Sequence, residues 1–177
     1  MAFNIVVEDG SIVPNANSYV SVVDFLSYAE MNGYDLETDN SVPVYLIKAM
    51  NYLESKNYKG LPVSSTQSLK WPREGAYIIC EQPDVLYPSD SIPANLIKAQ
   101  MQLALLVSDG IDLMPTISSE SFVKMEKVGP LQTEYSDAAA ENISMRPVFP
   151  LVDSLLQCMI TNGFGLSAFR TVRASYG

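Results

Sequence analysis

The stretch of sequence that decides the fold is residues 89–110, which read SDSIPANLIKAQMQLALLVSDG. A helix over 92–109 would be apolar around most of its circumference, through Leu96, Ile97, Met101, Leu103, Ala104, Leu105 and Val107. Asp90-Ser91 can cap its start, and Asp109-Gly110 can end it. A helix that is apolar on most sides lies at the centre of a fold or is covered by a partner. We therefore expect a mainly α-helical protein organised around this helix.

Three further helices are predicted along the chain. Each begins with a capping or first-turn residue and carries apolar side chains at helical spacing. Ser21, with Asp24 three residues later, marks the most complete start. The predicted ranges are 22–32, 42–56 and 149–162, so the chain should form a small bundle of about four helices.

An inserted β-hairpin is predicted between residues 122 and 135, where apolar residues come at every second position around Gly129-Pro130. Residues 3–7 suggest a short strand. The hairpin's apolar set is Val123, Met125, Leu131 and Tyr135, and its polar set is Lys124, Glu126, Gln132 and Glu134. We expect one helical domain over 1–164 that includes the hairpin, followed by an extended C-terminal tail over 165–177.

Charge is unevenly distributed along the chain. It has 11 Lys and Arg, 20 Asp and Glu, no His, and a net charge of −9 at pH 7. All the acids precede residue 165, so the last thirteen residues carry +2, from Arg170 and Arg173. A strongly acidic protein repels nucleic acid over long range. Non-specific DNA binding is therefore not expected.

Most residue types that build catalytic sites are missing. Without His, the chain has no Ser-His or Cys-His pair and no imidazole metal ligand. Cys80 and Cys158 stand in no zinc or redox spacing; they could form one disulfide, but we expect two reduced thiols. We interpret Glu8-Asp9, Asp35-Glu37-Asp39 and Asp109/Asp112 as solvated loop charge, with a paired-acid or magnesium site as the alternative. The sequence therefore predicts no enzyme activity, no cofactor and no metal site.

The tail over 165–177 combines positive charge with apolar side chains. Aromatic residues and arginine are frequent anchors of protein interfaces. Two interpretations are open: an ordinary frayed terminus, or a peptide that docks on a partner protein. The docking residues would be Leu166, Phe169, Arg170, Val172, Arg173 and Tyr176.

Several short motifs, taken in order along the chain, resemble those of one protein family. They are Val7-Glu8-Asp9-Gly10, Asn15-Ala16-Asn17-Ser18-Tyr19-Val20-Ser21, Tyr58-Lys59-Gly60, Gln67-Ser68-Leu69-Lys70-Trp71-Pro72-Arg73, Ile92-Pro93 and Glu126-Lys127-Val128-Gly129-Pro130. Together they resemble the head-to-tail adaptor, or connector, proteins of tailed bacteriophages. Members of this family are often labelled DnaT-like single-stranded-DNA-binding proteins.

The resemblance implies a structural virion protein of the neck, present in the host cytoplasm before assembly. It would form a ring, usually a dodecamer, under the portal, connect capsid to tail, and let DNA pass during genome ejection without specific binding. Its partners would be the portal protein, neighbouring copies of itself and another neck or tail protein, and it would not bind a membrane.

The tail residues would bind the portal or an adjacent subunit. The polar set of the hairpin would contact a neighbouring subunit, unless the hairpin simply packs on its own domain. The alternative function is a DnaT-like single-stranded-DNA-binding replication protein.

Overall fold

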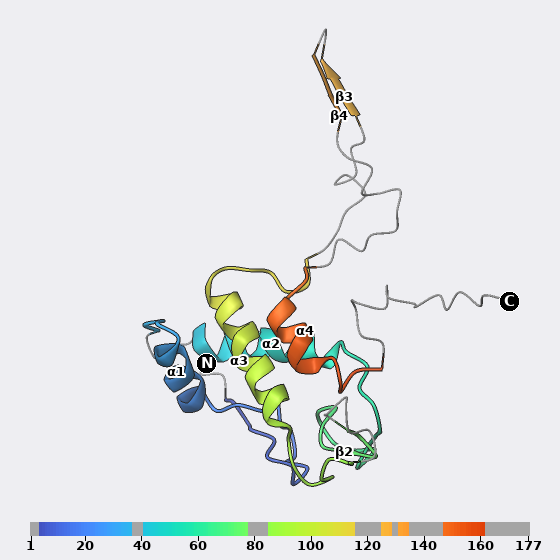
Figure 1. Cartoon of the computed structure of the whole chain (residues 1–177). Helices are drawn as coiled ribbons and strands as arrows, with labels where there is room; N and C mark the ends of the chain where they lie inside the picture. The colour runs from blue at the N-terminus through green and yellow to red at the C-terminus, as the bar shows by residue number, and fades with distance from the viewer. Residues whose placement is uncertain are drawn as a thin grey trace, which may run out of the picture. The chain divides into compact units, whose positions relative to one another are not determined.

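The protein is described by a computed structural model that places residues 4–36, 41–77, 85–115, 125–128, 131–134 and 147–161. The chain divides into two compact units (Figure 1). The helical unit comprises Met1–Leu113 and Phe149–Gly177, and the hairpin unit comprises Met114–Val148. The prediction of a mainly helical fold with about four helices and a β-hairpin is confirmed.

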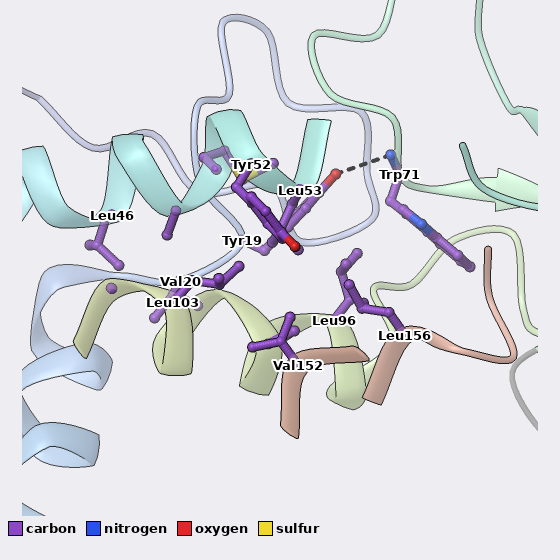
Figure 2. Packing of buried hydrophobic residues seen from close by; sticks show 14 of the residues in the cluster. Tyr19, Val20, Leu46, Tyr52, Leu53, Trp71, Leu96, Leu103, Val152 and Leu156 are labelled. Atoms are coloured by element: carbon purple, nitrogen blue, oxygen red, sulfur yellow. Dashed lines mark hydrogen bonds between the residues drawn. The ribbon is translucent and has the colours of Figure 1, made fainter. Parts of the chain in front are cut away.

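The central element of the helical unit is α3. The four helices are α1 (Val22–Met31), α2 (Ser41–Glu54), α3 (Ala94–Ser108) and α4 (Pro150–Leu156). Helix α3 contacts each of the other three, and its Leu96, Ala99, Leu103 and Ala104 are fully buried (Figure 2). The helix that is apolar on most sides is therefore covered by its own chain.

The helix starts agree only in part with the predicted caps. Ser21 caps α1 as expected, because its Oγ accepts a hydrogen bond from the Asp24 N–H at 3.1 Å. Helix α3, however, begins at Ala94 with Pro93 in the N-cap position and no side-chain cap. The residue before a proline is disfavoured in helical conformation, so Ile92 stays outside and the predicted cap at 90–91 is wrong.

The last helix is shorter than predicted, because α4 ends at Leu156 and not near residue 162. The chain then turns, and Ile160 pairs with Tyr58 in an antiparallel bridge. The N–H of Lys59 donates to the carbonyl of Met159, and the N–H of Thr161 to that of Asn57, both at 2.8 Å. These long-range hydrogen bonds take the place of another helical turn.

The other departures from prediction lie near the N-terminus and at Cys158. The strand expected over 3–7 is reduced, within residues 4–7, to a single bridge between Val7 and Ser18. Cys158 is disulfide-bonded, so the expectation of two reduced thiols is wrong.

Residues 57–77 form an irregular connection around an aromatic cluster. Two short strands, β1 (Leu61–Pro62) and β2 (Arg73–Glu74), pair antiparallel within it. Trp71 is fully buried, and its ring packs edge-on against Tyr58 and Tyr87, with centroids 6.0 Å apart in both pairs. Tyr58 and Trp71 therefore anchor this connection in the core.

The hairpin unit contains β3 (Met125–Val128) and β4 (Leu131–Glu134), which pair antiparallel as predicted. Met125 pairs with Glu134, and Glu126 pairs with Thr133. Lys127 pairs with Gln132, and Val128 pairs with Leu131. The division of the hairpin's side chains into an apolar and a polar set stays a prediction.

Candidate functional site

The first family motif, residues 7–10, is built around a buried carboxylate. Glu8 Oε1 accepts hydrogen bonds from the backbone N–H groups of Gly10 and Ile12, both at 2.9 Å, and Oε2 accepts one from Val13 at 2.8 Å. The loop therefore wraps around its own acid. The interpretation of Glu8 as solvated charge is wrong, whereas its neighbour Asp9 is exposed as predicted.

The second motif, residues 15–21, is held by a buried glutamine of the central helix. Gln100 Oε1 accepts from the N–H of Tyr19 at 2.9 Å, and its Nε2 donates to Ser18 Oγ at 2.8 Å and to the carbonyl of Leu46 at 3.3 Å. A satisfied buried polar network favours one arrangement of the segments that it joins. Here it fixes the motif against both α2 and α3.

The motif at residues 67–73 meets the second motif at Glu54, the last residue of α2. The Glu54 carboxylate accepts hydrogen bonds from the N–H of Lys70 at 3.1 and 3.2 Å and from the Tyr19 hydroxyl at 3.3 Å. The N–H of Trp71 donates to that same hydroxyl at 3.2 Å (Figure 2). Burial raises the pKa of Glu54, against the opposing effect of the Lys70 hydrogen bonds and charge.

Arg73 connects this motif to the one at residues 58–60. Its guanidinium donates through Nε to the carbonyl of Lys59 at 2.7 Å, through Nη1 to that of Lys70 at 3.0 Å, and through Nη2 to that of Gly60 at 2.6 Å. Burial lowers the pKa of Arg73 from its usual value. Because the side chain is buried and its donors face backbone carbonyls, Arg73 cross-links the fold and is not presented to a ligand.

Three lysines of the same region also direct their ammonium groups onto their own chain. Lys56 Nζ donates to the Tyr52 hydroxyl at 2.9 Å and lies 4.1 Å from the centroid of that ring. Lys59 Nζ lies 4.1 Å from the centroid of Tyr77, a cation–π contact. Lys70 Nζ donates to the carbonyl of Lys56 at 2.6 Å. Together with Arg73, these lysines bind the region to itself.

The exposed surface of the described residues is acidic. Two basic residues are exposed, Lys48 and Lys98, against eight acidic ones: Asp9, Asp24, Glu30, Asp35, Glu74, Asp90, Asp109 and Asp112. Across the described ranges with known side chains, every Phe, Tyr and Trp is buried or half-buried. A site for single-stranded nucleic acid combines a positive groove with exposed stacking aromatics. This part of the surface offers neither.

The predicted partner-binding residues lie mostly beyond the placed part of the chain. The tail residues Leu166, Phe169, Arg170, Val172, Arg173 and Tyr176, and Lys124 before the hairpin, lie outside the described residues. The backbone places Glu126 in β3, and Gln132 and Glu134 in β4. Their contact with a neighbouring subunit stays a prediction.

The sequence interpretation missed a set of exposed apolar side chains on the helical unit. Val23 and Met31 of α1 are 72% and 77% exposed, and Leu61 of β1 is 73% exposed. The sequence of α1 could have predicted the exposure of Val23 and Met31. Phe25 and Ala29 form the buried stripe of this helix, and Val23 and Met31 fall outside that stripe. Exposed apolar side chains grouped with charged ones are a common feature of protein interfaces.

The fold and its motifs define a class of small, mainly helical proteins with an inserted hairpin, in which the motif residues hold the core together. A family model described as "Putative DnaT-like ssDNA binding protein" matches residues 3–174. Because the match spans nearly the whole chain, the protein belongs to this family. No curated protein and no solved structure matches the chain. The family match confirms the DnaT-like label that the resemblance carried, and it supports the single-stranded-DNA-binding alternative better than the adaptor role.

Proposed function

We propose that the protein is a non-catalytic neck component of a tailed phage, a head-to-tail adaptor that forms a ring under the portal and joins capsid to tail. The observation that carries the proposal is the separation of charge in the helical unit. Among the described residues of this unit, Lys56, Lys59, Lys70 and Arg73 bind their own chain, whereas eight acids are exposed. A surface on which exposed acids outnumber exposed cations favours contacts with other proteins over phosphate binding.

The charge also suits a ring through which DNA passes. An acidic surface repels phosphates over several ångströms, and salt screens the effect beyond about 10 Å. DNA moving past such a surface is not retained. The motif residues that resemble those of the adaptors, such as Glu8 and Arg73, form the hydrogen bonds that hold the helical unit together. In this proposal they shape the subunit, and other surfaces make the assembly contacts.

The tail is the proposed docking element toward the portal. Its positive charge opposes the rest of the protein, and Phe169 and Tyr176 supply apolar anchors. Removing residues 165–177 should leave a folded domain by circular dichroism that no longer co-sediments with the portal protein of the same genome. Phe169→Ala should weaken docking more than Arg173→Ala, because central anchors typically cost more than about 2 kcal/mol and rim charges less. Unchanged binding by the truncated chain would show that the tail is not the docking element.

Single-stranded-DNA binding is the second candidate, and the family's description favours it. Such a site would need cations and aromatics from outside the described residues, for example Phe169, Arg170 and Arg173. A fluorescence-anisotropy titration of a labelled oligonucleotide separates the candidates. We expect no measurable binding at physiological salt. Micromolar affinity that falls steeply with salt, and that Arg170→Ala with Arg173→Ala removes, would establish the second candidate instead.

A further inference from the structure

The outer side of α1 and the segment that follows it form a surface here termed the acidic face, which comprises Val23, Asp24, Glu30 and Met31 of the helix and Asp35 four residues beyond its end. All five residues are exposed. Glu30 and Met31 come seven and eight positions after Val23, so all three lie on the same side of the helix. The face therefore has two well-exposed apolar side chains with carboxylates around them, which is the arrangement of an interface centre and its polar rim.

A second surface, termed the basic face, surrounds β1 and comprises Lys56, Lys59, Leu61, Val63 and Lys70. Leu61 and Val63 are exposed apolar side chains. The three lysines are half-buried, and their contacts with carbonyls and rings leave the positive charge in place. Glu74, which is exposed and pairs with Leu61 in β2, reduces the positive charge of this face without reversing it.

The acidic face lies beside the C-terminal half of α3, where Gln102 donates to the hydroxyl of Tyr28 in α1, and the basic face lies near the N-terminal end of α3. Tyr34, just after α1, donates through its hydroxyl to Asp109, the C-cap of α3, at 2.9 Å. At the other end, Trp71 packs against Tyr87, whose hydroxyl donates to the carbonyl of Ile92 just before α3 at 3.1 Å. A helix of 15 residues is about 22 Å long. Figure 1 likewise shows α1 and β2 at different ends of the helical unit.

We infer that the occupant of the acidic face is a second copy of this chain, which docks there through its basic face. The inference rests on the proposed function, because a ring needs one contact repeated between unlike surfaces. Charge complementarity selects this partner: three carboxylates on one face meet three ammonium groups on the other. Contact between two different faces of identical chains is heterologous and closes a ring when the rotation allows it.

The apolar side chains supply most of the affinity at this contact. Exposed ion pairs contribute little, about 0–1 kcal/mol each, so the charges mainly select partner and orientation. Met31 and Leu61 are the most exposed apolar residues of their faces. Changing either to a side chain that repels the opposite face should weaken self-association at least about tenfold.

A mixing experiment on the full chain tests this directly. Met31→Lys damages the acidic face only, and Leu61→Glu damages the basic face only. In sedimentation velocity at high protein concentration, each variant alone should be monomeric, whereas their equimolar mixture should form dimers through the one intact pair of faces. Leu151→Glu is the matched control, because Leu151 is 55% exposed on α4 and belongs to neither face. It should assemble like the unmodified chain.

The outcomes separate this inference from the proposed function. A mixture that stays monomeric, an unmodified chain that does not self-associate, or a control as impaired as the two variants would overturn the inference. If the mixture dimerises but the unmodified chain does not bind the portal, the interface stands and the adaptor role fails. If rings form on the portal while the mixture stays monomeric, the adaptor role stands and these faces are not its contact. Circular dichroism confirms that each variant is folded.

Discussion

The two ends of α3 use charged side chains in opposite ways. Near its N-terminal end, Glu54, Lys70 and Arg73 bind backbone groups of neighbouring segments. Near its C-terminal end, Asp109 and Asp112 are exposed, alongside the acids of α1. Among the described residues, exposed acids therefore outnumber exposed cations by eight to two, because Lys56, Lys59, Lys70 and Arg73 are buried or half-buried and contact groups of their own chain. The charge composition predicts the sign of the protein's electrostatic potential. The hydrogen bonds within the chain determine which charged side chains remain exposed to a partner.

The largest effect is expected from Arg73→Ala at the N-terminal end of α3. It removes a buried guanidinium that satisfies several backbone carbonyls, and unsatisfied buried groups cost about 1–3 kcal/mol each. We expect a loss of about 3–5 kcal/mol in the free energy of unfolding, measured by urea denaturation. Lys98→Ala, at an exposed cation, should change it by less than about 0.5 kcal/mol. Similar losses for the two variants would remove the distinction between interior and surface cations.

A second pair of variants makes the same comparison between adjacent acids. Glu8→Ala leaves three backbone N–H groups without their acceptor, so a loss of about 2–4 kcal/mol in the free energy of unfolding is expected. Asp9→Ala should have little effect, because Asp9 is exposed. Urea denaturation of both variants at pH 7 measures the difference. An Asp9 variant as unstable as the Glu8 variant would contradict the assignment of Glu8 as the buried acid.

A smaller effect on stability is expected from Gly→Ala changes at Gly60 and Gly33. Both glycines have positive φ, so the two variants share the same backbone strain and differ in the space around the new Cβ. Gly60 has φ of 72°, and a Cβ there would lie 2.3 Å from the carbonyl oxygen of Glu74. Gly33, after α1, has φ of 84° and open space around the Cβ position. Gly33→Ala should cost only the backbone strain, about 1 kcal/mol. Gly60→Ala should cost about 2 kcal/mol more in thermal or urea unfolding, and equal costs would show that the connection can move aside.

The smallest effect concerns pH and Glu54. Because burial raises its pKa in the folded state above the unfolded value, Glu54 contributes stability at low pH that is lost as the pH rises through the folded pKa. The free energy of unfolding of the unmodified chain, relative to Glu54→Gln, should therefore be larger near pH 4.5 than near pH 7, so the folded state is more stable at the lower pH. Urea titrations at several pH values measure this difference. A difference that moved the other way would mean that the Lys70 contacts outweigh burial.

Local patterns predicted the elements of this fold, and long-range contacts explain where they failed. The stripe of α1 and the cap at Ser21 depend on neighbours in sequence, and both are confirmed. The end of α4 depends on Asn57 and Tyr58, far away in the chain, and no local signal marks it. Glu8 and Asp9 look alike in sequence, yet only the turn of residues 10–13 buries one of them.

The candidate surfaces were harder to predict than the fold. Val23 and Met31 could have been found as apolar residues off the buried stripe of α1, but their proximity to the exposed carboxylates of that helix becomes clear only from burial. The basic face has no sequence signature, because β1 and the lysines are brought together by the Arg73 and Lys70 hydrogen bonds. The tail was proposed from charge and composition alone, and its docking stays a prediction.

The central claim is that this protein assembles with the portal through protein contacts. Negative-stain electron microscopy of the full chain mixed with the portal protein of the same genome tests it most directly. The account predicts an added ring of density on the portal, of about the portal's own symmetry, formed without DNA. Portal particles that remain bare at high concentrations of the chain, or that gain density only when single-stranded DNA is present, would contradict it.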